Sequence, residues 1–269
     1  MSKLTEYDSI PAIRWSTLAK ARKSPKHFRY AETHPTPDTD ALRIGRAVHC
    51  AVFEPERFAE RFVTYGASKT TGEGARKAWA AFQGQARANG QTIVDAAELE
   101  QIQAMAAEVR ACPTVAQHLM GGQAEVTEVW IDPETGLACK ARLDYRSRSG
   151  IIIDLKTAIN ADVRAFGAAA WRYGYFHQLE HYAKGNEATP VLLVVVEKDA
   201  PHDVAVFEPT QETREAAREE WRALLNTIAE CRRTGRYPGR YPEPTYVAAP
   251  AYVLGSEDDE WEVTTEARR

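Results

Sequence analysis

The stretch Ile151-Ile152-Ile153-Asp154-Leu155-Lys156-Thr157 decides the fold of this chain. It is a short apolar run that ends in an acid and a base, a pattern typical of a buried strand with charged groups at its end. Because alternate residues of a strand share a face, Asp154 and Lys156 point to the same side, with Cα atoms roughly 6.6 Å apart. We therefore expect these two charges to belong to one site.

A second acid, Asp144, lies near the end of the preceding strand, predicted over 137–146, and a turn at 147–150 joins the two strands. Asp144 can then lie beside Asp154 across the ladder. Two carboxylates at the end of apolar strands are costly unless they are neutralised. A divalent cation does this well, and oxygen ligands favour Mg²⁺ or Mn²⁺. Lys156 could then orient or help to deprotonate an attacking water.

Two helical motifs can add to this site. Gly45-Arg46-Ala47-Val48-His49 places an imidazole on a helix, and His49 can serve as a further metal ligand. Gln178 and Tyr182 are four residues apart and share a helix face, from which they can hold Lys156. Each motif also has an ordinary interpretation, as a surface histidine or an amphipathic helix.

Basic residues are the candidates for contacts with a polyanion. Lys140 and Arg142 share a strand face with Asp144 and are expected to point into the same cleft. Two further clusters, near the N-terminus and after the last helix, can bind phosphates in a salt-dependent way. The alternative is that these groups only solvate helix surfaces. The other candidates are Lys26, Arg29, Arg43, Arg46, Arg232, Arg233 and Arg236.

The order of elements predicts an α+β fold with a central mixed sheet flanked by helices and a helical N-terminal region. We expect a single domain over 1–240, with a helical part at about 1–120, a core at about 121–210 and a long helix at about 211–233. The remaining segment, 241–269, contains three prolines and an acidic cluster at 257–260 and is predicted to form an extended tail.

The net charge of −4 does not exclude a polyanion as ligand, because the charge is uneven. The tail alone carries −5, from seven acids and two bases, which leaves +1 for the rest. Only a uniformly basic surface is excluded.

The cysteines Cys50, Cys112, Cys139 and Cys231 are scattered, so we expect no iron–sulfur cluster. No apolar run reaches the ~18 residues of a membrane helix. The N-terminal residues lack a secretory apolar region, which predicts a cytoplasmic protein without a membrane partner.

Together these motifs resemble those of the PD-(D/E)XK nuclease superfamily, and within it the RecE-type (exonuclease VIII-like) and RecB-like exonucleases. Those families show a Gly-x-x-x-His helix, an Asp on a strand, Asp/Glu-x-Lys on the next strand and Gln-x-x-x-Tyr on a helix. The matching segments here are 45–49, Asp144, 154–156 and 178–182. The N-terminal phrases Trp15-Ser16-Thr17-Leu18 and Ser24-Pro25-Lys26-His27-Phe28 also resemble RecE-type phage and prophage enzymes. Asp154 stands where many members have Glu.

The resemblance implies a Mg²⁺-dependent 5′→3′ exonuclease that acts on linear double-stranded DNA, with Mn²⁺ as a possible substitute and one or two ions per site. It would leave 3′ single-stranded overhangs for an annealing protein of the RecT type, and it would act as an oligomeric ring. The implied catalytic residues are Asp144, Asp154, Lys156, Gln178 and Tyr182. The implied metal ligands are His49, Asp144, Asp154 and the backbone carbonyl of Leu155. The alternatives are an endonuclease of the same superfamily and a catalytically silent fold that binds DNA or a partner.

Overall fold

The computed structural model describes residues 3–34, 37–66, 72–241, 243–247 and 249. Within these residues, no helix is both long enough and apolar enough to cross a membrane. The elements are α1 (Lys3–Ser9), α2 (Trp15–Leu18), η1 (Ala19–Arg22), α3 (Pro25–Thr33), α4 (Asp40–Phe53), η2 (Pro55–Arg57), α5 (Phe58–Arg61), β1 (Phe62–Thr64), α6 (Gly72–Ala88), β2 (Thr92–Val94), α7 (Ala96–Ala111), α8 (Pro113–Leu119), β3 (Gln123–Ile131), β4 (Ala138–Arg146), β5 (Ile152–Ala158), α9 (Val163–Tyr173), α10 (Tyr175–Tyr182), β6 (Val191–Glu197), β7 (Val204–Phe207) and α11 (Gln211–Thr234).

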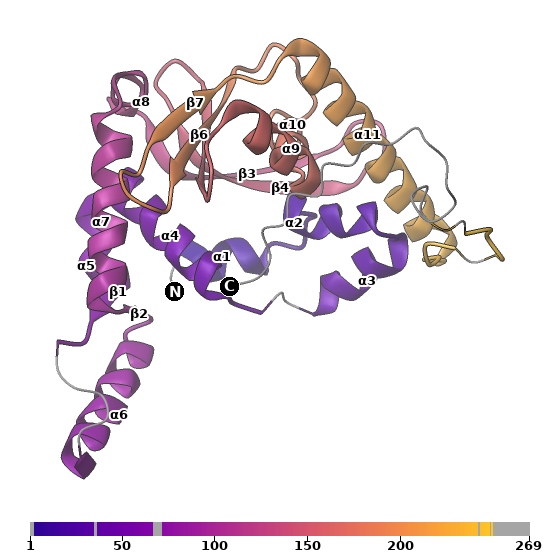
Figure 1. The fold of residues 1–269 in the computed structure, drawn as a ribbon. Coiled ribbons are helices and arrows are strands. Elements are labelled where there is room, and N and C mark those ends of the chain that lie inside the picture. The colour runs from indigo at the N-terminus through magenta and orange to yellow at the C-terminus, as the bar shows by residue number, and fades with distance from the viewer. Residues whose placement is uncertain (1–2, 35–36, 67–71, 242, 248, 250–269) are drawn as a thin grey trace.

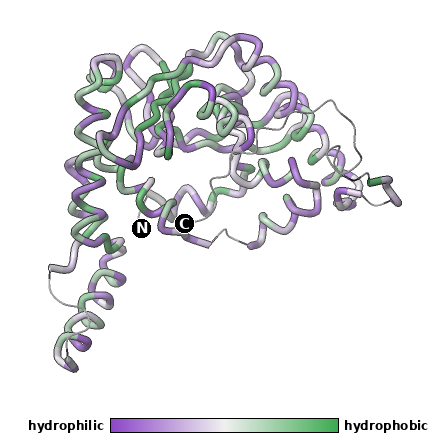
Figure 2. The backbone as a smooth tube through the Cα atoms, in the orientation of Figure 1, coloured by the Kyte–Doolittle hydropathy of each residue, from purple (hydrophilic) through white to green (hydrophobic). Residues whose placement is uncertain are grey.

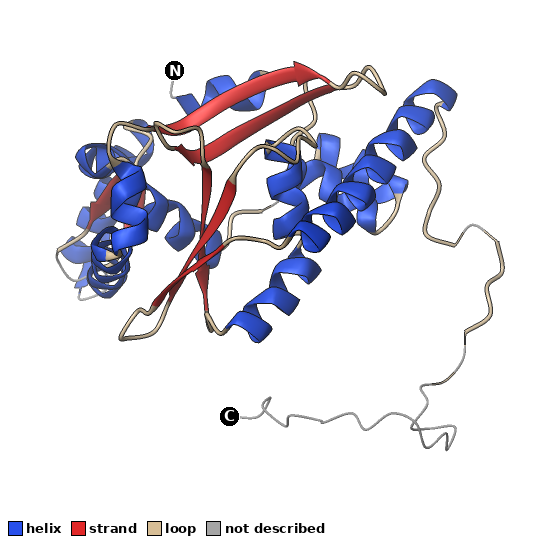
Figure 3. Ribbon diagram, turned by 90° about the horizontal axis from the view of Figure 1, so that it is seen from above, coloured by secondary structure: helices blue, strands red, loops and turns tan. Residues whose placement is uncertain are grey.

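The centre of the molecule is a five-stranded sheet in the order β3-β4-β5-β6-β7. Its only parallel neighbours are β5 and β6, and the other three pairs are antiparallel. Helices α9 and α10 form the crossover that a parallel pair requires. The hairpin of β3 and β4 turns away from the other strands (Figure 3). The predicted α+β fold with a mixed sheet flanked by helices is therefore confirmed.

The two faces of β5 contribute side chains to two different hydrophobic clusters. Ile153 and Leu155 pack among residues of α4 and α7, whereas Ile152 packs among residues of α9 and α10. This is the alternation expected of a strand buried on both faces. The most hydrophobic stretches accordingly lie in the strands at the centre of the molecule (Figure 2).

Helix α11 closes a third cluster, in which Trp221, Leu225 and Ile228 meet the N-terminal helices around Leu18 and Phe28. Figure 1 shows α11 running beside α10 and reaching α3 at its far end. Residues more than two hundred positions apart are thereby joined into one body. Helix α6 extends away from this body, beyond β1 and β2 (Figure 1).

Local signals explain where the main helices begin. The Thr39 hydroxyl accepts a hydrogen bond from the Leu42 amide at the start of α4. Asp95 and Glu98 form a capping box at the start of α7. Ser24 caps α3, whose first residue is Pro25.

The strand predicted over 137–146 and the helix predicted over about 211–233 agree closely with β4 and α11. The sequence analysis missed the parallel pair β1 and β2, because strands of three residues are too short to show an alternating pattern. The acidic cluster predicted at 257–260 lies outside the described residues.

Candidate active site

The site lies where β4 and β5 stop pairing. Their last paired residues are Tyr145 and Ile153, and the next residue along each strand beyond this pair is an aspartate. Past this point the backbone amide of Leu155 donates to Asp144 Oδ2, at 3.0 Å, instead of entering the ladder between the two strands. Asp144 and Asp154 therefore lie together at the fork of the strands, as the sequence pattern indicates.

Asp154 is the most deeply buried acid of the site, with 1% of its surface exposed. Lys156 Nζ lies 2.5 Å from Asp154 Oδ2. Among the described residues, no hydrogen-bond donor reaches Asp154 Oδ1. Burial raises the pKa of Asp154 to about 6, against the opposing attraction of Lys156. This carboxylate is therefore incompletely neutralised.

His49 enters the site from α4 and pairs with Asp144. The distance from His49 Nδ1 to Asp144 Oδ2 is 3.3 Å. Burial acts to lower the pKa of His49, but the charge and hydrogen bond of Asp144, together with the charge of Asp154, raise it above its ordinary value. In turn, burial would raise the pKa of Asp144, but His49 and Lys156 hold it below its ordinary value. The pair therefore favours a charged imidazole beside a charged carboxylate.

Lys156 is fixed by a chain of groups from α10. Its Nζ donates to Gln178 Oε1 at 3.1 Å, and Gln178 Nε2 donates to the hydroxyl of Tyr182 at 2.5 Å. The Tyr175 ring lies 4.8 Å from Nζ. Burial would lower the pKa of Lys156, but Asp154 and Asp144 raise it. The lysine is therefore held protonated, which favours orienting a water over deprotonating it.

The donor set fits a hard divalent cation, because buried carboxylate oxygens are the ligands such ions prefer. The orphaned Asp154 Oδ1 is the observation that carries this fit. In the described part of the chain, however, no three His, Cys, Asp or Glu side chains are grouped so as to hold a metal ion. The ammonium of Lys156 and the imidazole of His49 stand next to the acidic oxygens instead. The role of the Leu155 carbonyl stays a prediction.

Glu125 is a site residue that the sequence analysis missed. It lies opposite Asp144, because the pairs Ala124–Tyr145 and Val126–Leu143 flank this position in the β3–β4 ladder. Its backbone has φ 53°, in the left-handed region that a non-glycine residue rarely adopts. Its carboxylate lies 2.8 Å from Arg142 Nε. Pairing the strand predicted over 137–146 with the segment that precedes it in the chain would have revealed it.

The pKa of Glu125 is raised mainly by burial. Arg142 opposes this shift, and the negative charge of Asp144 adds to it. Like charges directly opposite in a ladder are destabilising unless something compensates them. Arg142 supplies that compensation, so this predicted DNA-binding residue does lie near the site, but it is paired with an acid.

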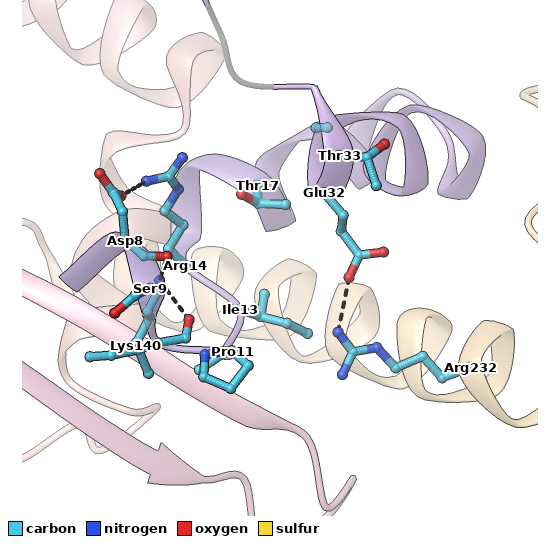
Figure 4. Close-up of a pocket in the computed structure, with 13 residues that line it drawn as sticks. Asp8, Ser9, Pro11, Ile13, Arg14, Thr17, Glu32, Thr33, Lys140 and Arg232 are labelled. Carbon is cyan, nitrogen blue, oxygen red and sulfur yellow. Dashed lines mark hydrogen bonds and ion pairs between the residues drawn. The ribbon is translucent and has the colours of Figure 1, made fainter. Parts of the chain in front are cut away.

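The prediction that Lys140 points into the same cleft is wrong. Only 4% of Lys140 is exposed, and its Nζ donates to the backbone carbonyls of Tyr7 and Ile10 at 2.8 and 2.9 Å. The reason is that the N-terminal segment lies across β4 and covers this position. Figure 4 shows Lys140 in a different cavity, which also holds ion pairs made by Arg14 and Arg232.

Arg43 is also unsuited to the role predicted for it. Its guanidinium lies 2.5 Å from Glu98 and 3.1 Å from Asp40, so it joins α4 to α7. The other predicted contacts remain at the surface. Lys26 and Arg236 are exposed, whereas the ion pairs of the others are Arg29–Glu32, Arg46–Asp38, Arg232–Glu32 and Arg233–Glu230.

The site opens into a cavity of about 640 Å³. His49 and Lys156 are among the residues that line it, and Arg46 lines it from α4. Its walls come from α4, β5 with the loop that follows it, and α9. A ligand can therefore reach Lys156 from this side.

A forked mixed sheet that carries an Asp and an Asp-x-Lys strand, backed by a Gln-x-x-x-Tyr helix, defines a domain of the PD-(D/E)XK type. The chain belongs to the family described as the PDDEXK-like domain of unknown function (DUF3799), which matches residues 15–249.

Two of the solved structures that match this chain cover most of its length. One, from Eubacterium rectale, is titled a "Putative exonuclease"; it has 11% identity and a TM-score of 0.51, with 95% of this chain and 96% of that chain covered. At this identity the likeness concerns the fold alone. The other, the crystal structure of SSO0001, has 16% identity and a TM-score of 0.30, over 84% of this chain and 88% of that chain, and carries no argument. A search of curated proteins gave no match.

Proposed function

We propose that this protein is a metal-dependent deoxyribonuclease that degrades linear double-stranded DNA from its ends. The observation that carries the proposal is the forked pair Asp144 and Asp154 with Lys156 beside them, held by Gln178. Family membership and the exonuclease description of the Eubacterium rectale protein support it. Buried charges of this kind are costly in a protein that does not use them.

Asp144 and Asp154, with the carbonyl of Leu155, would hold Mg²⁺ or Mn²⁺, and His49 would join them once its imidazole has released its proton. When bound, such a cation polarises the scissile phosphate and offsets the charge that develops on the leaving 3′ oxygen.

The side chains of the site supply the remaining steps. Lys156 donates hydrogen bonds that orient the attacking water and keeps one positive charge near the phosphate. Gln178 accepts from Lys156 and fixes its ammonium, while Tyr182 fixes Gln178 in turn. His49 orients Asp144 through their contact. Helix α10 thus positions the lysine without touching the reacting atoms.

Digestion of two DNA substrates tests this proposal. Linear duplex and covalently closed circular DNA are incubated with the protein and Mg²⁺, with a chelator as control. We expect loss of the linear DNA only, and none with the chelator. Cutting of the closed circle would instead favour the alternative endonuclease, and metal-dependent loss of neither substrate would favour the silent DNA-binding or partner-binding fold.

The finer features of the proposal follow from the resemblance. We propose 5′→3′ polarity, 3′ overhangs that an annealing protein of the RecT type would bind, and assembly into a ring around DNA. Duplexes labelled at the 5′ or the 3′ end test the polarity, because a 5′→3′ enzyme releases the 5′ label first. Sedimentation of the purified protein tests the ring, and a monomer with full activity would contradict it.

A further inference from the structure

The cavity beside Lys156 has an unusual lining for a surface that contacts duplex DNA. Much of its wall is apolar, with Phe166 and alanines of α4, α9 and the end of β5. Two large apolar side chains at this cavity are strongly exposed: Leu42 is 49% and Ile159 is 80% exposed. Basic groups add to the lining, from Arg46, Arg172 and Lys198 in addition to Lys156.

A row of neighbouring aromatic and basic groups leads outward from Lys156 along this wall. The Lys156 ammonium lies 4.8 Å from the centre of the Tyr175 ring. The Tyr175 and Tyr173 rings follow, with centroids 5.8 Å apart and planes inclined by 32°. The guanidinium of Arg172 lies 4.9 Å from the Tyr173 ring, and Tyr173 is 58% exposed. The row therefore joins the catalytic lysine to the solvent.

Aromatic and apolar groups of this kind have no partner on a base-paired helix. A duplex presents phosphates and sugars outward and keeps the faces of its bases stacked inside. An unpaired nucleotide presents a planar base that stacks on tyrosine or arginine, and a phosphate that nearby cations bind. The combination of tyrosines, arginine and lysine in one cavity therefore suits an unpaired nucleotide better than a duplex.

We propose that the row Lys156–Tyr175–Tyr173–Arg172 is a stacking subsite for unpaired nucleotides of the DNA strand that is cut. This inference rests on the proposed nuclease function, and it adds that the strand crosses the site as a single strand. Tyr173 is a positioning residue in this scheme, because it holds the base and leaves the reacting phosphate to Lys156 and the carboxylates.

Binding without divalent metal tests the subsite independently of catalysis. Fluorescence anisotropy measures the affinity for a labelled single strand of about 12 nucleotides, within the known range of single-strand site sizes. Loss of one stacked base predicts that Tyr173→Ala weakens this binding by about 5- to 100-fold. Tyr173→Phe keeps the ring and should bind as the wild type does. Tyr30→Ala is the matched control, since Tyr30 is 62% exposed but does not line the cavity.

A fully paired, blunt-ended duplex serves as the second probe. We expect Tyr173→Ala to leave its binding unchanged, because its bases are paired. The subsite is refuted if Tyr173→Ala binds the single strand as tightly as the wild type does, or if it weakens both probes equally. Failure of the nuclease proposal gives a different result: the wild type does not hydrolyse linear DNA with Mg²⁺, whatever the binding pattern.

Discussion

Helix α10 separates two buried charged clusters that differ in how completely their charges are neutralised. On one side, Gln178 and Tyr182 face Lys156 and the acids of the site. On the other side, Glu180 is fully buried and both of its oxygens are bound, with Arg214 Nε at 2.6 Å and Arg218 Nε at 3.2 Å. Asp154, equally buried, has one oxygen that no described group satisfies.

The cluster around Glu180, whose charges are neutralised, stabilises the fold. The cluster around Asp154, which has an unsatisfied oxygen, can still bind a ligand. A satisfied buried pair holds α10 against α11, and breaking it leaves an uncompensated charge. An unsatisfied carboxylate raises the free energy of the folded chain until a ligand compensates it. The following predictions test this contrast, from the largest expected effect to the smallest.

Replacement of Glu180 should destabilise the fold most. We expect Glu180→Ala to lower the free energy of unfolding by about 3–5 kcal/mol, because Arg214 and Arg218 lose their shared counter-ion. Urea unfolding followed by circular dichroism measures the change. The control is Glu187→Ala, whose side chain is 68% exposed and pairs with Arg218, and which should cost under about 1 kcal/mol. Equal effects of the two variants would contradict the contrast.

Replacement of Lys156 should mainly affect catalysis. We expect Lys156→Ala to lower the rate of DNA hydrolysis by about 10²–10³-fold, as for loss of one oriented donor, with the fold retained. Initial rates on linear duplex with Mg²⁺ measure this. Lys77→Ala on α6, which removes a lysine whose side chain is 77% exposed, is the control and should be fully active. A Lys156→Ala variant with wild-type activity would rule out the proposed mechanism.

His181, another buried residue of α10, predicts how the free energy of unfolding depends on pH. His181 Nε2 donates to the Lys140 carbonyl and its Nδ1 accepts from Trp221 Nε1, so the ring is neutral. Burial lowers the pKa of His181 to about 4. Its contribution is therefore complete above the unfolded value of about 6.5 and is lost as the pH falls toward 4, by on the order of 3 kcal/mol.

Thermal unfolding as a function of pH checks this expectation. His181→Gln can still donate and accept hydrogen bonds but does not titrate. Its midpoint temperature should consequently fall less steeply than that of the wild type between pH 6.5 and 4. Identical slopes for the two proteins would show that other groups control the acid transition.

Metal binding by Asp154, on the other side of α10, should depend on pH. A proton competes with the cation for Asp154, whose pKa is about 6. Below that pH we expect the apparent affinity for Mn²⁺ to fall by about tenfold per pH unit, measured by isothermal titration calorimetry. Asp154→Asn should bind weakly at every pH, whereas Asp199→Asn, at an exposed position, should behave as the wild type. A pH-independent affinity would contradict this role of Asp154.

Local patterns correctly predicted which side chains share a face within a single strand or helix. Period-two alternation placed Asp154 and Lys156 on one face of β5, and i, i+4 spacing placed Gln178 and Tyr182 on one face of α10. These relations hold because they depend only on the geometry of one element, which neighbouring residues in the chain determine. The contact of Gln178 with Lys156 also agrees with the role expected of it.

Some predictions for the basic residues were wrong because contacts with distant parts of the chain decide where these side chains lie. Lys140 shares a strand face with Asp144 by sequence. The N-terminal segment nevertheless covers Lys140, and backbone carbonyls of that segment accept hydrogen bonds from its ammonium. Arg43 pairs with Glu98, which lies 55 positions away in the chain. Glu125 was not predicted as a site residue because its place in the site depends on Asp144, which lies opposite it in the ladder.

The sequence by itself determined the order of helices and strands, the alternation along β5 and the residue types of the site. The tertiary structure decided which charges are compensated: Glu180 meets two arginines of α11, whereas Asp154 meets only Lys156 among the described residues. The physical reason is that the cost of a buried charge depends on every group within a few ångströms, and most of these groups come from distant parts of the chain.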